Sequence, residues 1–459
     1  MATETLNVLL VGGGGREHAL AWKLKQSPRC GTLFATPDGM SNPGIAALAK
    51  PVDFPWDLKD AFRIQRWCVS NRIGLAVIGP EEPLCMGLAD ILRGEESGVG
   101  SGGLGGLGGA VPAVFGPSRQ AAQLEGDKSF CKDVLRQASV PTAEGRAFTD
   151  YEQARAFLES RTEAQVIKAC GLAKGKGVFV PANSAEALAA LDRIMVKKEF
   201  GDAGRKVLIE ERLKGREVSI FALVDGRTIY VLETCQDHKR LLDGARGPNT
   251  GGMGAICPAS RAFIDDAMLD RVQREVLVPT IDAMKRDGIE YSGVLYAGIM
   301  LTPGGPKVLE YNCRFGDPEC QALMARLDTD LVDVLEGVAT RRLDQVDLRW
   351  KGGDAATAVC VVLAAEGYPE RPRGGSVITG IEEAERAGEE AGGSGALVFH
   401  AGTRLNEKGE IVTSGGRVLS VVGTGKDPAS ARSAAYGAAE RVRFAGMQMR
   451  RDIGTEVVG

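Results

Sequence analysis

The stretch from Lys307 to Gln321 places the strongest constraint on the fold, because it combines a strand pattern, a tight polar turn and the start of a helix. Side chains two positions apart on a strand lie on the same face of a sheet. One face is therefore predicted to hold Val308, Glu310, Asn312 and Arg314. The other face is predicted to hold Leu309, Tyr311 and Cys313. The stretch thus predicts a rigid strand with one polar face.

The polar face carries groups suited to phosphoryl transfer. Glu310 and Asn312 offer hard oxygen ligands at a spacing that lets both reach one Mg²⁺. The guanidinium of Arg314 suits a phosphoryl group beside that ion. A Glu-x-Asn pair by itself is also compatible with an ordinary exposed strand face. The polar turn Phe315–Glu319 adds two carboxylates at the end of the strand, where sites are usually built, and this favours the functional interpretation.

The length and charge of the chain restrict its class. With 459 residues the chain is too long for a single hydrophobic core, and two to four domains are expected. A net charge of -4 provides no basic field, so neither nucleic acid nor a membrane is expected as a partner. No apolar run reaches the roughly 18 residues of a spanning helix, and the first residues do not resemble a signal peptide. A cytoplasmic location is therefore expected.

Cysteine and histidine patterns exclude several kinds of site. The 10 cysteines contain no Cys-x-x-Cys pattern, so neither a zinc site nor a disulfide framework is predicted. The 3 histidines, His18, His238 and His400, lack the sequence context of a hydrolytic triad. His400 is expected to be structural, because no carboxylate or metal-ligand spacing accompanies it.

The N-terminal segment reads as a short apolar strand, Asn7–Val11, a turn of glycines, Gly12–Gly15, and a helix. This order is typical of a phosphate-binding turn, with Arg16 adding positive charge at the helix start. The dinucleotide fingerprint is incomplete, because its third glycine position is occupied by Glu17 or His18. A dehydrogenase is therefore disfavoured, and a merely tight turn is the alternative to a phosphate site.

Further strand patterns alternate with helical ones and predict a parallel α/β sheet. These strands are expected at Thr32–Ala35, Gly74–Ile78 and Ala113–Phe115. The glycine-rich stretch Gly94–Ala110 cannot bury enough surface to offset the entropy cost of ordering it. It is predicted to be a flexible insertion and not a phosphate loop, because neither a helix start nor a lysine follows it.

A second glycine-rich loop, Gly171–Gly177, follows two lysines, Lys128 and Lys168. It resembles a P-loop, but three residues separate its first two glycines, and its last glycine stands where Ser or Thr would hold Mg²⁺. Strand patterns on both sides favour a hairpin that closes over ATP phosphates. An ordinary solvated turn is the alternative.

Two segments after this loop also point to ligand binding. The strand Lys206–Leu213 is typical of a hinge whose backbone reads adenine, with Glu217 placed for the ribose hydroxyls. The stretches Gln236–Arg240 and Gly247–Gly254 are dense in charged residues, Asn and Gly. Loops of this composition within an apolar framework commonly carry binding functions.

Taken together, these segments closely resemble the glycinamide ribonucleotide synthetase (phosphoribosylamine–glycine ligase) family of the ATP-grasp superfamily. The resemblance is carried by Gly13–Ala19, Gly171–Ala173, Gly175–Gly177, Gln236–Arg240, Gly247–Gly254 and Arg314–Glu319. It continues through Gly293–Gly298, Val398–Thr403 and Gly415–Leu419, and so runs nearly end to end. All of the histidines lie inside these segments.

The resemblance implies a multidomain α/β and α+β protein with an ATP-grasp fold. A parallel α/β domain would precede the ATP-grasp part, and a C-terminal mixed domain would follow it. The implied boundaries are 1–122 for the N-terminal domain with its insertion at 94–110, 123–212 for the lid region, 213–345 for the central domain and 346–459 for the C-terminal domain.

The resemblance also implies roles for individual residues. ATP would be bound by Lys128, Lys168, Gly171, Gly175, Lys176, Gly177, Glu210, Glu211, Leu213 and Glu217. The metal ligands would be Glu310 and Asn312. Catalytic groups around glycine and the reacting phosphoryl group would be Asp237, His238, Lys239, Arg314 and Asp317. Substrates would contact Gly13, Gly14, Gly15, Arg16, Glu17, Asn249, Thr250, Gly251, Gly252, Met253 and Gly254.

The implied reaction is the ATP-dependent ligation of glycine to 5-phosphoribosylamine in de novo purine biosynthesis, through glycyl phosphate. The implied cofactors are ATP and Mg²⁺ or Mn²⁺, and a monomer or weak homo-oligomer is expected. Two alternatives stay open at this point. One is another ATP-grasp ligase, such as a formate-dependent transformylase or a carboxylase. The other is a nucleotide-binding regulator with a dead site, which the presence of both Glu310 and Asn312 disfavours.

Four features depart from the family pattern. They are the insertion Gly94–Ala110, Cys170 in place of a common Asp, Asp127 in place of a usual Ser, and Pro37–Ser41 in place of a commoner Pro-Gly-Asn arrangement. None of them involves the metal pair. The last one leaves open how that loop would contact phosphoribosylamine.

Overall fold

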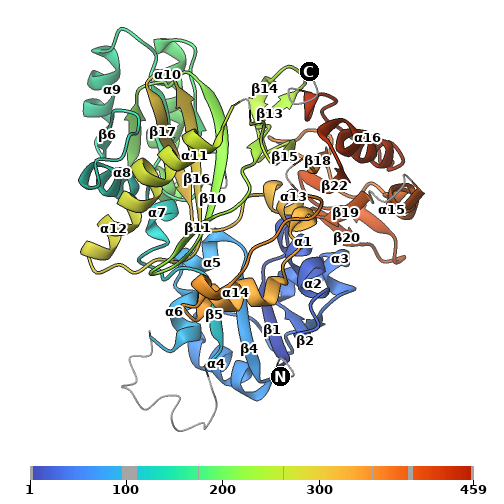
Figure 1. Cartoon of the computed structure of the whole chain (residues 1–459). Helices are drawn as coiled ribbons and strands as arrows, with labels where there is room; N and C mark the ends of the chain where they lie inside the picture. The colour runs from blue at the N-terminus through green and yellow to red at the C-terminus, as the bar shows by residue number, and fades with distance from the viewer. Residues whose placement is uncertain are drawn as a thin grey trace.

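The computed structural model describes residues 4–95, 111–173, 175–261, 263–353, 355–390 and 396–455. The predicted insertion at 94–110 lies outside the described residues from position 96 onward. Figure 1 shows the N-terminal part at one end of the molecule, with the middle and C-terminal parts side by side above it. The domain boundaries expected from the sequence stay a prediction.

The N-terminal part contains a parallel sheet of strand order β3-β2-β1-β4-β5. Its strands are β1 (Leu6–Val11), β2 (Cys30–Ala35), β3 (Lys50–Pro51), β4 (Ile73–Ile78) and β5 (Ala113–Phe115). Its helices are α1 (Gly15–Leu24), α2 (Pro37–Ser41), α3 (Pro43–Ala46), α4 (Ala61–Ser70), α5 (Glu81–Cys85) and α6 (Leu88–Arg93). The predicted parallel α/β sheet is therefore confirmed, and its apolar runs reflect burial on both faces.

A second, antiparallel sheet has the strand order β6-β9-β7-β8. Its strands are β6 (Gly145–Phe148), β7 (Val166–Ala169), β8 (Val178–Phe179) and β9 (Val207–Glu210). The associated helices are α9 (Tyr151–Glu159), α10 (Ser184–Leu191), the π-helix Asp192–Val196 and the 3₁₀ turn Gly201–Gly204. Because β7 and β8 pair antiparallel, the predicted hairpin around the second glycine loop is confirmed.

The third sheet has the strand order β11-β10-β16-β17 and is antiparallel throughout. Its strands are β10 (Arg216–Asp225), β11 (Ile229–Val231), β16 (Ser292–Thr302) and β17 (Gly305–Asn312). The helices packed with it include α7 (Gln123–Gly126), α8 (Lys128–Gln137), α11 (Asp266–Val272), the π-helix Gln273–Leu277 and α12 (Val278–Arg286). Strand β17 lies at the edge of this sheet and carries the predicted metal ligands.

Strand β17 contains a β-bulge that corrects one expectation from the sequence. Gly298 of β16 pairs with Glu310 and the next residue, Ile299, pairs with Val308, so Leu309 is the extra residue. Val308 is consequently fully buried in the same apolar cluster as Tyr311 and Cys313. The prediction that Val308 shares the polar face was wrong, because strict alternation assumes a ladder without an extra residue. Glu310 and Asn312 keep the predicted common face.

The C-terminal sheet has the strand order β12-β15-β18-β22-β19. Its strands are β12 (Gln236–Asp237), β15 (Gly254–Cys257), β18 (Thr357–Ala364), β19 (Ala396–His400) and β22 (Arg417–Gly425). Strand β12 and the first residue of β15, Gly254, come from the stretches that the sequence suggested to be loops. Between them runs a two-stranded ribbon of β13 (Arg240–Leu242) and β14 (Arg246–Asn249). The middle of the chain is thereby built into the C-terminal sheet.

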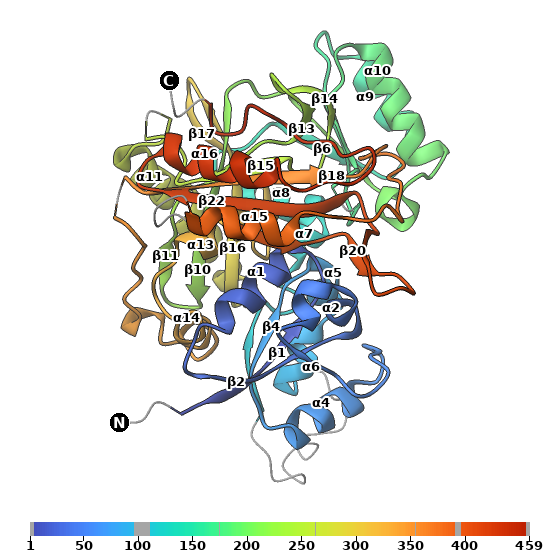
Figure 2. The same cartoon turned by 90° about the vertical axis from the view of Figure 1, so that its right-hand side faces the viewer.

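Helices cover both faces of the C-terminal sheet, and one of them also contacts the N-terminal part. Figure 2 shows α15 (Ile381–Glu390) and α16 (Pro428–Ala439) on the outer face, above the N-terminal sheet. Helix α13 (Glu319–Arg326) contacts β15, β18 and β22 as well as α1 of the N-terminal part. The remaining elements are α14 (Leu331–Ala339), the 3₁₀ turn Leu343–Gln345, β20 (Thr403–Leu405) and β21 (Ile411–Thr413). One apolar cluster, which includes Leu20, Leu323 and Cys360, runs through this junction.

Candidate active site

A cavity of about 1230 Å³ lies where the second and third sheets face each other, beside the N-terminal and C-terminal parts. The predicted site residues that line it are Arg16, Lys128, Lys168, Gly175, Gly177, Glu210, Glu211, Leu213, Glu217, Asp237, His238, Lys239, Asn249, Thr250, Gly251, Glu310, Asn312, Arg314 and Asp317. Nearby but outside this lining are Gly13, Gly14, Gly15, Glu17, Gly171, Lys176, Gly252, Met253 and Gly254. The tertiary structure therefore brings most of the predicted site residues together around one cavity.

Glu310 and Asn312 fit a divalent metal ion. Both side chains are partly exposed and face the cavity, so their oxygens are accessible to a bound ligand. Burial acts to raise the pKa of Glu310, but Lys239 and Lys168 outweigh it and hold the pKa below its usual range. Within the described residues, no group of three His, Cys, Asp or Glu side chains forms a ready-made metal cage. A pair of protein oxygens completed by substrate phosphates is the arrangement that Mg²⁺ commonly takes.

Lys239 lies between two carboxylates of the cavity. Its Nζ is 3.7 Å from the Glu217 Oε2 and 3.9 Å from the Glu310 Oε1. At these distances the ammonium supplies charge without forming a close hydrogen bond to either carboxylate. Lys239 therefore connects the metal pair with the carboxylate expected near the ribose.

Arg314 is held by two carboxylates that the sequence analysis did not assign to the site. Its Nη2 lies 2.8 Å from the Glu125 Oε1, and its Nε lies 3.3 Å from the Glu81 Oε2. Its Nη2 also donates to the Asn312 Oδ1 at 3.1 Å. Burial acts to raise the pKa of Glu81, but Arg314 and Arg16 lower it to about 2. Glu81 follows the carboxyl end of β4, a position typical of functional side chains, and that signal was available in the sequence.

A buried triad of two lysines and one carboxylate lines the cavity beside the strand of the predicted metal pair. Glu210 contacts the Lys168 ammonium through Oε1, and its Oε2 lies 2.9 Å from the Lys132 Nζ. Burial acts to lower the pKa of Lys168, but Glu210 and Glu310 raise it above its ordinary value. Burial lowers the pKa of Lys132, with Glu210 acting against the shift. Sequence reasoning missed Lys132, because no local pattern distinguishes it from other helical lysines.

The turn after β17 is tied to the C-terminal sheet. The Asp317 Oδ2 lies 3.3 Å from the Arg417 Nη2, and its Oδ1 accepts from the Gln321 Nε2 at 2.9 Å. Burial acts to raise the pKa of Asp317, but Arg417 and Arg16 lower it overall. Arg417 also donates to the Gly251 carbonyl oxygen at 2.7 Å, so it joins two predicted substrate segments. Its position in the site follows from the fold and was not predicted.

Asp237 has an unusual carboxyl group. Its Oδ1 is buried and has no hydrogen-bond partner among the described residues. Burial and the neighbouring Glu319 raise the pKa of Asp237 well above its ordinary value, although Lys239 acts to lower it. The adjacent His238 is fixed through its backbone, with its N–H donating to Gly254 and its carbonyl accepting from Met253, both at 2.9 Å. Perturbed carboxyl groups of this kind are common at functional sites.

The glycine turn of the N-terminal part lies beside the Asp317 turn. The Gly14 N–H donates to the Glu17 Oε2 at 2.7 Å, and Arg16 contacts the same carboxylate at 2.6 Å. A Cβ on Gly13 would lie 2.2 Å from the Asp38 carbonyl oxygen, so the segment with the unusual Pro37–Ser41 sequence packs directly on this turn. Close packing of the backbone explains why glycine is needed at Gly13.

The remaining departures have local structural explanations. Asp127 caps α8 by accepting from the Ser129 N–H at 2.8 Å, which is a role that Asp fills as well as Ser. Cys170 is buried, and burial raises the pKa of its thiol to about 12. The Lys128 Nζ donates to the Gly171 carbonyl oxygen at 3.4 Å, which ties α8 to the glycine loop.

His18 and His400 join α1 to β19 behind the site. The backbone N–H of His400 donates to the His18 Nδ1 at 2.8 Å, and its own Nδ1 lies 3.0 Å from the Thr403 Oγ1. Burial, together with His400, lowers the pKa of His18 to about 3, and burial lowers the pKa of His400 to about 4. These contacts support the structural role predicted for His400.

Comparison with protein families gives matches along most of the chain. Residues 6–125 match the phosphoribosylglycinamide synthetase N domain, 126–320 its ATP-grasp (A) domain and 358–456 its C domain.

Individual relatives and solved structures agree with these matches. The chain is 46% identical to a phosphoribosylamine–glycine ligase of Rhodopirellula baltica over 97% of both chains. It is 42% identical to that of Neisseria meningitidis serogroup A over 99% of this chain and 100% of the relative. The crystal structure of a Thermotoga maritima phosphoribosylamine–glycine ligase is 31% identical, has a TM-score of 0.77, and covers 98% of this chain and 100% of its own.

More distant solved structures share the fold. A biotin carboxylase domain from Hydrogenobacter thermophilus is 16% identical with a TM-score of 0.68, over 97% of this chain and 92% of its own. Identity at this level shows the ATP-grasp architecture alone, and the predicted fold class is confirmed. The full-length identity to the ligases goes further: the chain belongs to the phosphoribosylglycinamide synthetase family, as its sequence motifs predicted.

Proposed function

We propose that this chain is an ATP-dependent phosphoribosylamine–glycine ligase that forms glycinamide ribonucleotide, ADP and phosphate in purine biosynthesis. The names of its relatives, at 42% to 46% identity over nearly their full lengths, support this activity and enzyme class. The observation that carries the proposal is one cavity that holds Lys168, the Glu310 and Asn312 pair, and Arg314 together. Nothing in the relatives supports the alternative of a transformylase, a carboxylase or a regulator.

ATP would lie between the second and third sheets. Lys128 and Lys168 would contact its phosphates, and the loop containing Gly171, Gly175, Lys176 and Gly177 would cover them. Leu213, Glu211 and Glu217 would surround adenosine from the cavity wall. Glu210 has both carboxylate oxygens engaged by lysines, so its contribution to nucleotide binding would run through those lysines.

Glu310 and Asn312 would hold Mg²⁺ or Mn²⁺. Such an ion neutralises phosphate charge and polarises the phosphoryl group when bound. Lys239 and Arg314 add fixed positive charge beside the same position. Preorganised charges of this kind contribute more in a cavity than in water, because they need no reorganisation during the reaction.

The reaction requires two displacements. A glycine carboxylate oxygen attacks the γ-phosphorus of ATP, giving glycyl phosphate and ADP. The amine of phosphoribosylamine then attacks the glycyl carbonyl carbon, phosphate leaves, and the amine loses a proton. The chain would mainly position the reactants: Arg314, Asp317 and Asp237 around glycine, and the Gly13–Glu17 turn and the Asn249–Gly254 segment near phosphoribosylamine. Closure of the β7–β8 hairpin would keep water from the reactive intermediates.

An ADP-release assay with each substrate omitted in turn tests this proposal. ADP formation is expected to require glycine, and formation of the amide product is expected to require phosphoribosylamine as well. Formate and bicarbonate serve as controls and should not replace glycine. ADP release driven by either of them would contradict the assignment.

Other expectations accompany the proposal. The partners are the small-molecule substrates, and a monomer or weak homo-oligomer is expected. In the described parts of the chain, every helix is too short or too polar to cross a bilayer. The cytoplasmic location, the oligomeric state and the domain boundaries stay predictions.

A further inference from the structure

The buried triad of Lys132, Glu210 and Lys168 contains more positive than negative charge. All three residues are at most 5% exposed and line the cavity. Buried charges are stable only when paired and hydrogen-bonded, and here two ammonium groups share one carboxylate. The triad by itself therefore carries one net positive charge, and among the described residues Glu310 is the further carboxylate that acts on Lys168.

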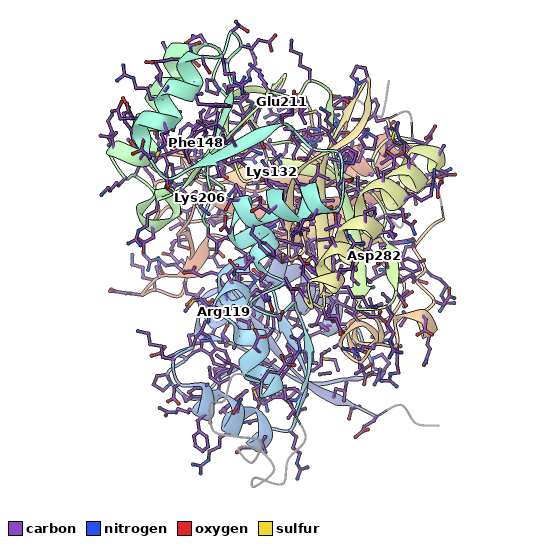
Figure 3. All side chains as sticks on the ribbon, turned by 90° about the vertical axis from the view of Figure 1, so that its left-hand side faces the viewer. Arg119, Lys132, Phe148, Lys206, Glu211 and Asp282 are labelled. Atoms are coloured by element: carbon purple, nitrogen blue, oxygen red, sulfur yellow. The ribbon has the colours of Figure 1, made fainter. Side chains whose placement is uncertain are left out.

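The ammonium of Lys132 is held by two hydrogen bonds and one ion pair. Its ammonium donates to the Thr142 Oγ1 and to the Ala143 carbonyl oxygen, both at 2.7 Å, and lies 2.9 Å from the Glu210 Oε2. Two of its three N–H donors are therefore used in hydrogen bonds, and the ammonium is paired with Glu210 by charge. In Figure 3, Lys132 lies on α8 close to β6, the strand that follows these two acceptors. Lys132 is therefore placed to act on a nucleotide through Glu210.

The hydrogen bonds of Lys168 leave one donor free. Within the described residues its ammonium contacts the Glu210 Oε1 and donates to the Leu309 carbonyl oxygen at 3.1 Å. Leu309 is the extra residue of the β17 bulge, so this bond links Lys168 to the strand of the metal pair. The third N–H remains available in the cavity.

From this arrangement we propose that Lys132 is a positioning residue for ATP. By sharing the Glu210 carboxylate, Lys132 prevents that carboxylate from neutralising Lys168, which keeps a net positive charge and one N–H for a phosphate oxygen. The inference rests on the proposed function in so far as Lys168 contacts ATP phosphates. It adds a residue that touches no substrate and acts through the charge balance of the triad.

The test measures binding to the purified chain of two probes, a non-hydrolysable ATP analogue with Mg²⁺ and adenosine, by calorimetry. Lys132→Met should weaken binding of the ATP analogue about tenfold or more. In this variant Glu210 neutralises Lys168, so Lys168 contributes less to a charge-assisted hydrogen bond with a phosphate oxygen. Adenosine has no phosphate and should bind unchanged. Equally weakened binding of both probes would instead indicate a distorted fold or a distorted adenine-binding site, and would overturn the inference.

A second substitution makes the test specific. In Lys132→Met/Glu210→Gln, the carboxylate that neutralises Lys168 is gone, so the ATP analogue should bind more tightly than to Lys132→Met and within about threefold of the parent chain. A further loss of affinity would contradict the charge-balance mechanism. If Lys132→Met gives no folded protein, the affinity of the double variant for the ATP analogue is compared with that of the parent chain. A tenfold loss of affinity in the double variant would then reject the inference.

A matched control comes from the same part of the chain. Lys197, which follows the π-helix Asp192–Val196, is exposed and lies outside the cavity lining. Lys197→Met should bind both probes as the parent does, and weakening equal to that of Lys132→Met would overturn the inference. Because the readout is binding, a parent that binds the ATP analogue but does not ligate glycine would refute the proposed function alone.

Discussion

Arg417 and Asp317 form an ion pair between the C-terminal sheet and the turn that follows strand β17, with 3.3 Å between Nη2 and Oδ2. The same guanidinium donates to the backbone carbonyl of Asp317 and to that of Gly251. Arg417 begins β22, whereas Asp317 precedes α13. The C-terminal part of the chain therefore completes the candidate active site and is not merely attached behind it.

Substitution of Arg417 should impair catalysis more than stability. In Arg417→Met, Asp317 and the Gly251 carbonyl lose a charged donor, and kcat/KM is expected to fall about tenfold to a hundredfold, since such bonds contribute about 1.5–3 kcal/mol. Steady-state ligation kinetics measure the effect. Arg404→Met, on the exposed part of β20, should keep parental kinetics; equal losses in the two variants would refute the role of Arg417.

Substitution of Glu310 tests the metal pair. Glu310→Ala should abolish ATP-dependent ligation while the chain stays folded, because the side chain faces the cavity and supports no apolar packing. Turnover against Mg²⁺ concentration and thermal unfolding provide the two readouts. Glu407→Ala, at an exposed position, is the control. Near-normal turnover of Glu310→Ala at saturating Mg²⁺ would remove this residue from the metal site.

Gly252 is predicted to be essential for the shape of the substrate segment. Its φ is +112°, and an added Cβ would lie 2.6 Å from the Asp237 Oδ1 and from the Pro318 Cδ. Gly252→Ala should therefore destabilise the fold by about 1–3 kcal/mol and lower turnover. Gly437→Ala in α16 has no neighbour within 4 Å and should instead stabilise by about 0.5–1 kcal/mol. Chemical denaturation of both variants measures this contrast, and a Gly252→Ala chain of parental stability would contradict it.

The two buried histidines predict a loss of stability in acid. The folded-state pKa is about 3 for His18 and about 4 for His400, compared with an ordinary value of 6.5, so the unfolded chain binds more protons below that value. Their contribution is complete above pH 6.5 and is lost as the pH falls towards 4. Each histidine adds a slope of up to about 1.4 kcal/mol per pH unit.

Unfolding free energies at pH 7, 6 and 5 measure this dependence. His18→Gln keeps an acceptor for the His400 N–H but does not titrate, so its slope should be shallower than that of the parent. His18→Gln/His400→Gln should be flatter still. An unchanged slope in the double variant would assign the acid sensitivity to other groups.

The sequence by itself determined the features that depend on neighbours along the chain. The glycine turn before α1, the β7–β8 hairpin and the common face of Glu310 and Asn312 follow from local spacing, because backbone geometry sets which side chains can share a face. The same local motifs were distinctive enough to predict the family. Strand β17 and the turn after it were located in this way.

Tertiary structure alone decided the features that depend on partners far along the chain. The bulge at Leu309 arises from pairing with β16, which no pattern within β17 reveals. Arg314 pairs with Glu81 and Glu125. Glu210 pairs with Lys132, and Asp317 pairs with Arg417. The partners come from different parts of the chain. A charge removed from water needs a counter-charge, and only the folded chain decides which residue supplies it.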